Sequence, residues 1–103
     1  MTFLSTTEPL DADGFITLGP ILAGRSDKVV GSVFSDQDGT IFIEQSSDNE
    51  HWDISTEYSI TANDGKGFSE DLLLSFIRIR FVNGSTNQNE FRLTSRFSSA
   101  GPR

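Results

Sequence analysis

Apolar and polar residues alternate with a period of two along most of the chain after residue 28. In the segment 76–82, Phe-Ile-Arg-Ile-Arg-Phe-Val, the side chains of Ile77, Ile79 and Phe81 share one face of a strand, and two arginines share the other. Apolar residues do not recur at helical spacing over any long segment, and Gly, Asn, Asp and Ser interrupt the pattern at short intervals. The pattern predicts an all-β protein.

Seven segments carry this alternation and are expected to form strands. They are 15–18, 29–34, 40–45, 53–62 with a break near Glu57, 67–70, 76–82 and 90–97. A chain of 103 residues has the size of one domain, and its nine phenylalanines supply large side chains for a core. We therefore expect a single antiparallel β-sandwich.

The first 27 residues differ from the rest because Pro9, Gly14 and Gly19-Pro20 interrupt a polar, turn-rich stretch. We interpret residues 1–27 as an N-terminal arm or edge segment, residues 28–97 as the β-sandwich domain and residues 98–103 as a flexible tail.

The last two predicted strands are joined by residues 83–89, which open with the turn dipeptide Asn-Gly. We interpret these strands as a hairpin whose apolar faces coincide, so that four arginines project from one surface. They are Arg78, Arg80, Arg92 and Arg96. This surface is either an ordinary solvated face or a docking surface for an acidic partner, because clustered like charges repel and arginine favours bidentate contacts with carboxylates.

Charge is unevenly distributed along this chain of net charge −7. Residues 1–74 contain 14 acidic and three basic residues, whereas residues 75–103 contain one acidic and five basic residues. The negative total argues against nucleic acid as the main partner, but the basic surface of one protomer can meet acids of another. The acids expected to serve this contact are Asp36, Asp38, Glu44, Asp48, Glu50 and Asp53.

Few residues are suited to catalysis or metal binding. The chain has no cysteine and one histidine, which excludes a thiol nucleophile and a multi-histidine metal site. A calcium loop with Gly39 at its sixth position would have Phe34 and Gln45 where carboxylates are required. We expect no enzyme activity, no cofactor and no metal, and the lack of a long apolar run predicts no membrane partner and synthesis in a cytoplasm.

Trp52, the one indole in the chain, follows a turn in which Asn49 occupies a position that favours glycine. Trp52 either packs over the end of the core or offers a platform for a sugar. A glycan site would require Trp52, Tyr58 and the polar loop 83–89 to converge at one end of the sandwich. His51 is expected to be a solvent-exposed turn residue.

Residues 36–53 and 76–84 resemble small β-sandwich proteins encoded in the structural regions of tailed phages and prophages. The segment 46–52 is also similar to the Ser-x-Asp-Gly-x-x-Trp turn of discoidin-like jelly rolls, with Asn49 in place of glycine, and residues 76–79 resemble their aromatic-Ile-Arg-Ile strand. The resemblance covers about residues 29–97. Because the cysteine pair of discoidin-type domains is missing, no carbohydrate or lipid site is transferred from them.

This resemblance implies a jelly-roll-like fold and a non-enzymatic virion structural protein, such as a head decoration, fibre or tail-associated subunit. Such a protein would be made in the host cytoplasm and would form homo-oligomers and contacts with other virion proteins, with the four arginines as the partner-binding residues. The alternative is a carbohydrate-binding module that recognises host-surface glycans through Trp52 and Tyr58.

Overall fold

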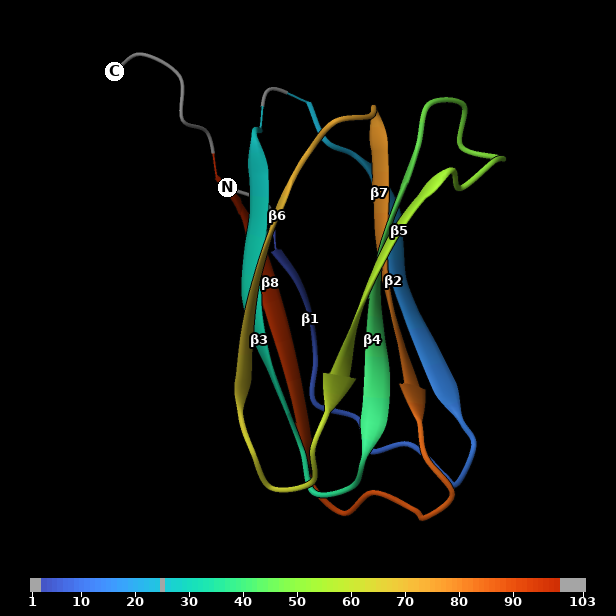
Figure 1. Cartoon of the computed structure of the whole chain (residues 1–103), viewed down its shortest axis with the longest axis vertical. Coiled ribbons are helices and arrows are strands. Elements are labelled where there is room, and N and C mark those ends of the chain that lie inside the picture. The colour runs from blue at the N-terminus through green and yellow to red at the C-terminus, as the bar shows by residue number, and fades with distance from the viewer. Residues whose placement is uncertain (1–2, 25, 99–103) are drawn as a thin grey trace.

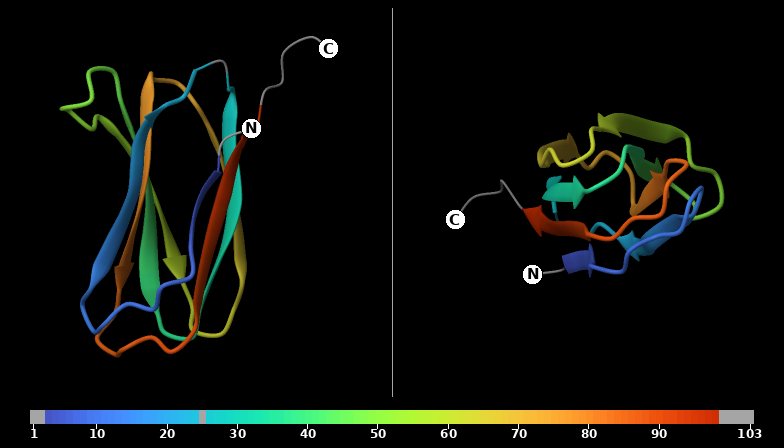
Figure 2. Two further views of the ribbon diagram at one scale, coloured as in Figure 1. Left: turned by 180° about the vertical axis from the view of Figure 1, so that it is seen from behind. Right: turned by 90° about the horizontal axis from the view of Figure 1, so that it is seen from below.

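The computed structural model describes residues 3–24 and 26–98, which form eight strands in two antiparallel sheets. The first sheet has the order β1-β8-β3-β6, and the second has the order β2-β7-β4-β5. The two sheets face each other as layers whose strands run along the long axis of the molecule (Figures 1 and 2). The strands are β1 (Phe3–Thr6), β2 (Phe15–Leu22), β3 (Lys28–Ser35), β4 (Gly39–Ser46), β5 (Ile54–Ile60), β6 (Lys66–Asp71), β7 (Phe76–Asn83) and β8 (Phe91–Ser98).

This strand order is that of a jelly roll, which confirms the expected fold class. Only β4 and β5 are consecutive strands within one sheet, and each other connection crosses to the opposite layer. β5 runs through Glu57 without the expected break, because Glu57 is exposed and pairs in register with Phe42. Among the described residues, no helix is long and apolar enough to span a membrane.

The N-terminal segment contributes one strand to each sheet. β1 pairs with β8 at the edge of the first sheet, and β2 pairs with β7 at the edge of the second. β2 continues to Leu22, beyond the predicted end at residue 18, after a register shift between Leu18 and Ile21. Ser98 ends β8, and the remaining residues of the expected tail, 99–103, lie outside the described part of the chain.

The core is formed by the alternate residues that face inward from both sheets, as the period-two pattern predicts. The rings of Phe81 on β7 and Phe91 on β8 join the layers, with their centroids 4.7 Å apart and their planes tilted by 47°. Burial of each such side chain contributes about 1.5–3 kcal/mol. The buried cluster comprises Val29, Val33, Ile41, Ile43, Ile60, Phe68, Ile77, Ile79, Phe81, Phe91, Leu93 and Phe97.

The expected hairpin between the last two strands is wrong, because β7 and β8 belong to different sheets. The connection 84–90 crosses the lower end of the sandwich in Figure 1 and is held there by long-range hydrogen bonds. The Gln88 side chain donates to Ser35 Oγ at 2.9 Å and accepts the Leu10 amide at 2.8 Å. The buried Asn83 amide donates to the carbonyls of Asp11 and Thr86, so residues distant in sequence fix the path of the loop.

Gly39 has a packing role at the start of β4. It is the first residue of β4 and is absent from the positive-φ residues of the described chain. A Cβ atom on Gly39 would lie 2.5 Å from Phe81 Cζ and 2.8 Å from the carbonyl oxygen of Val82. Glycine is therefore required because β4 passes close to β7 at this point.

Candidate binding surfaces

The four arginines predicted to form one patch lie on opposite outer faces of the sandwich. Arg78 and Arg80 project from β7 in the second sheet, whereas Arg92 and Arg96 project from β8 in the first sheet. The outward direction of each side chain agrees with the sequence pattern, but the single patch is wrong because the two strands do not pair. Partner binding by these arginines stays a prediction, now for two separate surfaces.

On the second sheet, the two arginines converge on one carboxylate of their own chain. Arg78 Nε lies 2.8 Å from Glu44 Oε1, and Arg80 Nη2 lies 3.4 Å from Glu44 Oε2. The guanidinium carbon of Arg78 is 4.1 Å from the centroid of the Trp52 ring, and that of Arg80 is 4.4 Å from the centroid of Phe42. We call these five residues the arginine–aromatic cluster.

Glu44 is the ionised centre of the arginine–aromatic cluster, although it is buried. Burial by itself raises the pKa of this carboxyl, but hydrogen bonds from Arg80 and Arg78 and their positive charges outweigh that effect. The pKa of Glu44 is therefore lower than its ordinary value of 4.5. Glu44 is thus engaged by its own chain instead of being available to an arginine of a neighbour.

The first sheet carries a trough that crosses its strands at the middle of the outer face. Its floor is a row of small residues on four adjacent strands: Gly67 on β6, Ser32 on β3, Thr94 on β8 and Ser5 on β1. Two adjoining hollows of about 610 and 620 Å³ lie over this row and share Ser32, Gly67 and Thr94 in their lining.

Larger side chains form the two walls of the trough. Val30 pairs in register with Arg96 on one side of the floor, and Phe34 pairs with Arg92 on the other. The guanidinium carbon of Arg92 lies 4.5 Å from the centroid of the Phe34 ring. The same guanidinium group forms an exposed ion pair with Glu90 through Nη1. Arg96 is exposed and forms no ion pair with any described residue.

No aspartate or glutamate of the described chain lines either hollow. Lys66 contributes to the lining, but its ammonium nitrogen lies over the ring of Tyr58, 5.7 Å from the centroid. The positive side chains that flank the floor are therefore the two arginines of β8.

The residues of the trough floor were not among the binding residues predicted from the sequence. A signal was present: the outward positions of the segments 30–34 and 92–96 both read large-small-large, with Ser32 and Thr94 at their centres. That signal becomes a trough only when the two segments pair in register, and the predicted pairing of 90–97 with 76–82 concealed it.

Trp52 and Tyr58, the candidates for glycan binding, do not form a common site. The loop 47–53 between β4 and β5, which contains Trp52, lies at the upper end in Figure 1, whereas the loop 84–90 lies at the lower end. The guanidinium group of Arg78 stacks over the Trp52 ring. Tyr58 pairs in register with Ile41, packs against the core and donates its hydroxyl hydrogen to Glu70. Glycan binding by either aromatic residue stays a prediction, but their convergence with the loop is wrong.

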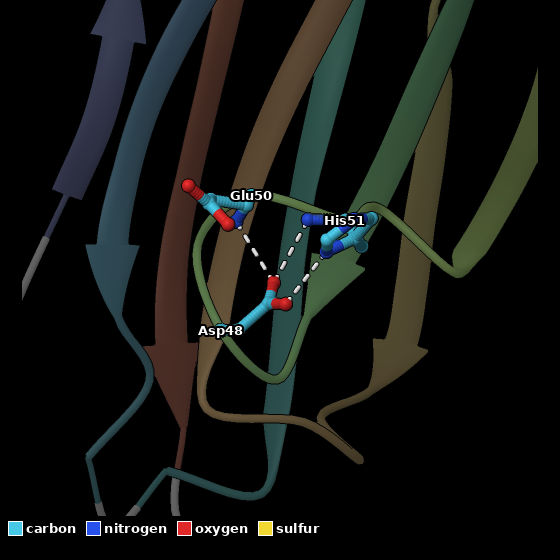
Figure 3. Close-up of side chains that lie close together, drawn as sticks. All are labelled: Asp48, Glu50 and His51. Atoms are coloured by element: carbon cyan, nitrogen blue, oxygen red, sulfur yellow. Dashed lines mark hydrogen bonds and ion pairs between the residues drawn. The ribbon is translucent and has the colours of Figure 1, made fainter.

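The turn after β4 brings together three residues that carry metal-ligand atoms, namely Asp48, Glu50 and His51 (Figure 3). Asp48 Oδ1 accepts the backbone N–H groups of Glu50 and His51, and Asp48 Oδ2 lies 2.7 Å from His51 Nδ1. Asn49 has the φ of +64° that favours glycine at this position. The Asp48 carboxylate thus closes the turn through bonds within the chain.

The hydrogen bonds in this turn also shift the pKa values of Asp48 and His51. The backbone and side-chain hydrogen bonds from His51 hold the pKa of Asp48 well below its ordinary value, and Asp48 in turn raises the pKa of His51 above 6.5. His51 is exposed, as expected.

Known proteins resemble this chain in both sequence and structure. A family model described as "Uncharacterised protein YqxG N-terminal domain" matches residues 2–98. The chain is 35% identical to "Uncharacterized protein YqxG" and 34% identical to "Phage-like element PBSX protein XepA", both of Bacillus subtilis (strain 168). Each comparison covers 87% of this chain, but the chain spans only 30% and 32% of those relatives.

The crystal structure of PBSX exported protein XepA superposes on 99% of this chain with a TM-score of 0.89 and 25% identity, and 38% of that protein is covered. The crystal structure of PirA has a TM-score of 0.59 at 12% identity, with 94% of this chain and 95% of PirA covered, which shows a shared fold. Because the family model matches nearly the whole chain, the chain belongs to the YqxG N-terminal domain family.

Proposed function

We propose that this chain is a non-enzymatic structural module of a phage-like element and acts through protein–protein contacts in the assembled particle. The similarity to XepA carries this proposal, because it spans most of the chain in sequence and nearly all of it in structure. XepA is named as a protein of the phage-like element PBSX and as an exported protein, which supports a location in the virion after synthesis in the host cytoplasm.

Within the particle, the module is proposed to serve as a head-decoration, fibre or tail-associated subunit. Its partners are further copies of itself and other virion proteins. A heterologous contact requires unlike surfaces on one protomer, and the arginines of the outer faces differ from the acidic loops at the lower end of the sandwich in Figure 1. Exposed acids in those loops include Glu8, Asp11, Asp13, Asp38 and Asp64.

Sedimentation of particles tests this function directly. Particles released from induced host cells are separated on a density gradient, and the protein is detected in each fraction with an antibody. We expect the protein to sediment with the particles and to return to the top of the gradient in cells that lack a major particle protein. Protein that stays at the top of the gradient in both strains would contradict the proposal.

A further inference from the structure

We propose that the trough on the first sheet binds an acidic segment of a partner protein in extended conformation. The existence of such a partner in the particle rests on the proposed function, whereas the recognition chemistry rests on the trough alone. The length of the floor, the arginines on the walls and the absence of described acidic residues from the lining each support an acidic peptide as the ligand.

The dimensions of the floor suit an extended chain. Gly67, Ser32, Thr94 and Ser5 lie side by side on four neighbouring strands. Adjacent strands are about 4.8 Å apart, so the floor is about 14 Å long, which is the length of about four extended residues. Because the floor residues are small, a peptide can lie across the strands between the two walls.

The positions of the two arginines suit acidic side chains. Arg92 and Arg96 flank Thr94 on the same strand, so one guanidinium lies on each wall. Successive side chains of an extended peptide project in opposite directions, and neighbouring acids can therefore meet opposite walls. Arginine binds carboxylates through paired N–H donors, which favours this pairing.

The charge of the trough contrasts with that of the chain. The chain has a net charge of −7, but no described acidic residue lines either hollow. Arg96 has no ion-pair partner among the described residues, and the ion pair of Arg92 with Glu90 is more than half exposed on both sides. Exposed ion pairs contribute little, so a carboxylate of the partner can replace Glu90 at small cost.

The floor also provides hydrogen-bonding groups for a peptide backbone. The hydroxyl groups of Ser5, Ser32 and Thr94 are exposed and make no hydrogen bond with a described residue. They can donate to carbonyl groups and accept from amide groups of the bound segment.

An acidic protein segment fits the trough better than a glycan does. Sugar rings stack on open aromatic faces, but the face of Phe34 is covered by the Arg92 guanidinium group. The rest of the lining includes small side chains, hydroxyl groups and Arg96, for which no ion pair with a described residue is found.

Fluorescence anisotropy with a labelled peptide that contains consecutive glutamates between flanking serines tests the inference. We expect saturable binding by the whole protein, and no binding of a matched peptide in which glutamine replaces glutamate. Arg92→Gln and Arg96→Gln should each weaken binding about two- to fivefold, the range of an exposed ion pair. The control Lys28→Gln removes a positive charge outside the hollows, where Lys28 pairs with Asp71, and should change binding less.

A steric variant separates occupation of the trough from general attraction of charge. Ser32→Tyr leaves the charge unchanged but fills the middle of the floor, so it should abolish peptide binding. Ser59→Tyr places the same side chain at an exposed position on β5 of the second sheet and should bind as the wild type does. Circular dichroism establishes that both variants are folded.

Three outcomes would overturn the inference: no binding of the acidic peptide, equal binding by Ser32→Tyr and Ser59→Tyr, or Ser32-dependent binding of neutral oligosaccharides instead. These results are independent of the sedimentation experiment. If the protein sediments with particles but does not bind the peptide, the proposed function is supported and the inference about the trough is wrong. If it binds the peptide but does not sediment with particles, the inference about the trough is supported and the proposed function is wrong.

Discussion

At the scale of single residues, Gly31 shows how closely β3, β6 and β8 pack. A Cβ atom on Gly31 would lie 2.2 Å from the carbonyl oxygen of Thr94 and 2.7 Å from Phe68 Cζ. Because the first neighbour is backbone, a side chain at this position forces the strands to move.

Gly31→Ala should therefore lower the free energy of unfolding by about 1–3 kcal/mol, as overpacking of a core does. Urea denaturation measures this change. Gly65→Ala is the matched control, because a Cβ at Gly65 would have no heavy atom within 4 Å outside Gly65 and its two chain neighbours. Equal stability of the two variants would show that the packing around Gly31 is looser than described.

His51 offers a second test at this scale, since it is the one histidine of the chain and gives a single NMR titration curve. Its pKa should lie above 6.5 in the wild type and return toward 6.5 in Asp48→Asn. A raised pKa means that this ion pair stabilises the folded state below about pH 6.5, and that its contribution is lost as the pH rises through the pKa of folded His51. Identical curves for the two proteins would contradict the described turn.

At the scale of elements, the side chain of Tyr58 connects β5 of the second sheet to β6 of the first. Its hydroxyl donates to Glu70, and this hydrogen bond, together with burial and the negative charge of Glu70, raises the pKa of Tyr58 to about 12. Ultraviolet titration of this single tyrosine should show the raised value, and Glu70→Gln should move it toward 10.0. Circular dichroism at each pH shows whether the fold persists, and a wild-type pKa near 10.0 would disprove the link.

The arginine–aromatic cluster connects β4 with β7, and Glu44→Gln tests its contribution. We expect a loss of about 1–2 kcal/mol at neutral pH, less than for a fully buried ion pair because the arginine side chains are 27% and 32% exposed.

The effect of Glu44→Gln should depend on pH. Since the pKa of folded Glu44 lies below 4.5, the wild type loses this stabilisation as the pH falls from about 4.5 through that pKa, and the difference from Glu44→Gln should shrink. Urea unfolding across this pH range measures the difference, with Glu57→Gln as the control for loss of an exposed carboxylate. A difference that stays constant with pH would contradict the described role of Glu44.

Strands and their buried faces could be predicted from sequence, because the alternation in segments such as 76–82 and 90–97 is a local property of each strand. Sheet membership could not, since it depends on contacts such as that of Gln88 with Leu10, far apart in the chain. The connection 84–90 has seven residues, which is longer than an ordinary hairpin loop. This length argues against a hairpin between the last two strands. The trough was missed for the same reason, because its floor exists only when four strands align.

At the scale of the whole molecule, the jelly roll presents two outer faces of different chemistry. On the second sheet, Arg78 and Arg80 are paired with Glu44. On the first sheet, Arg92 and Arg96 flank an open trough. The fold thereby separates the two arginines that pair with Glu44 from the two arginines that we propose bind a partner.

Incorporation into particles tests the central claim most directly, because it requires both the proposed function and the trough. Wild-type protein, Ser32→Tyr and Ser59→Tyr are each expressed in induced cells, and their amounts in purified particles are compared by immunoblotting. The account predicts that wild type and Ser59→Tyr sediment with the particles, whereas Ser32→Tyr, though folded, stays at the top of the gradient. Equal incorporation of all three proteins, or of none, would contradict it.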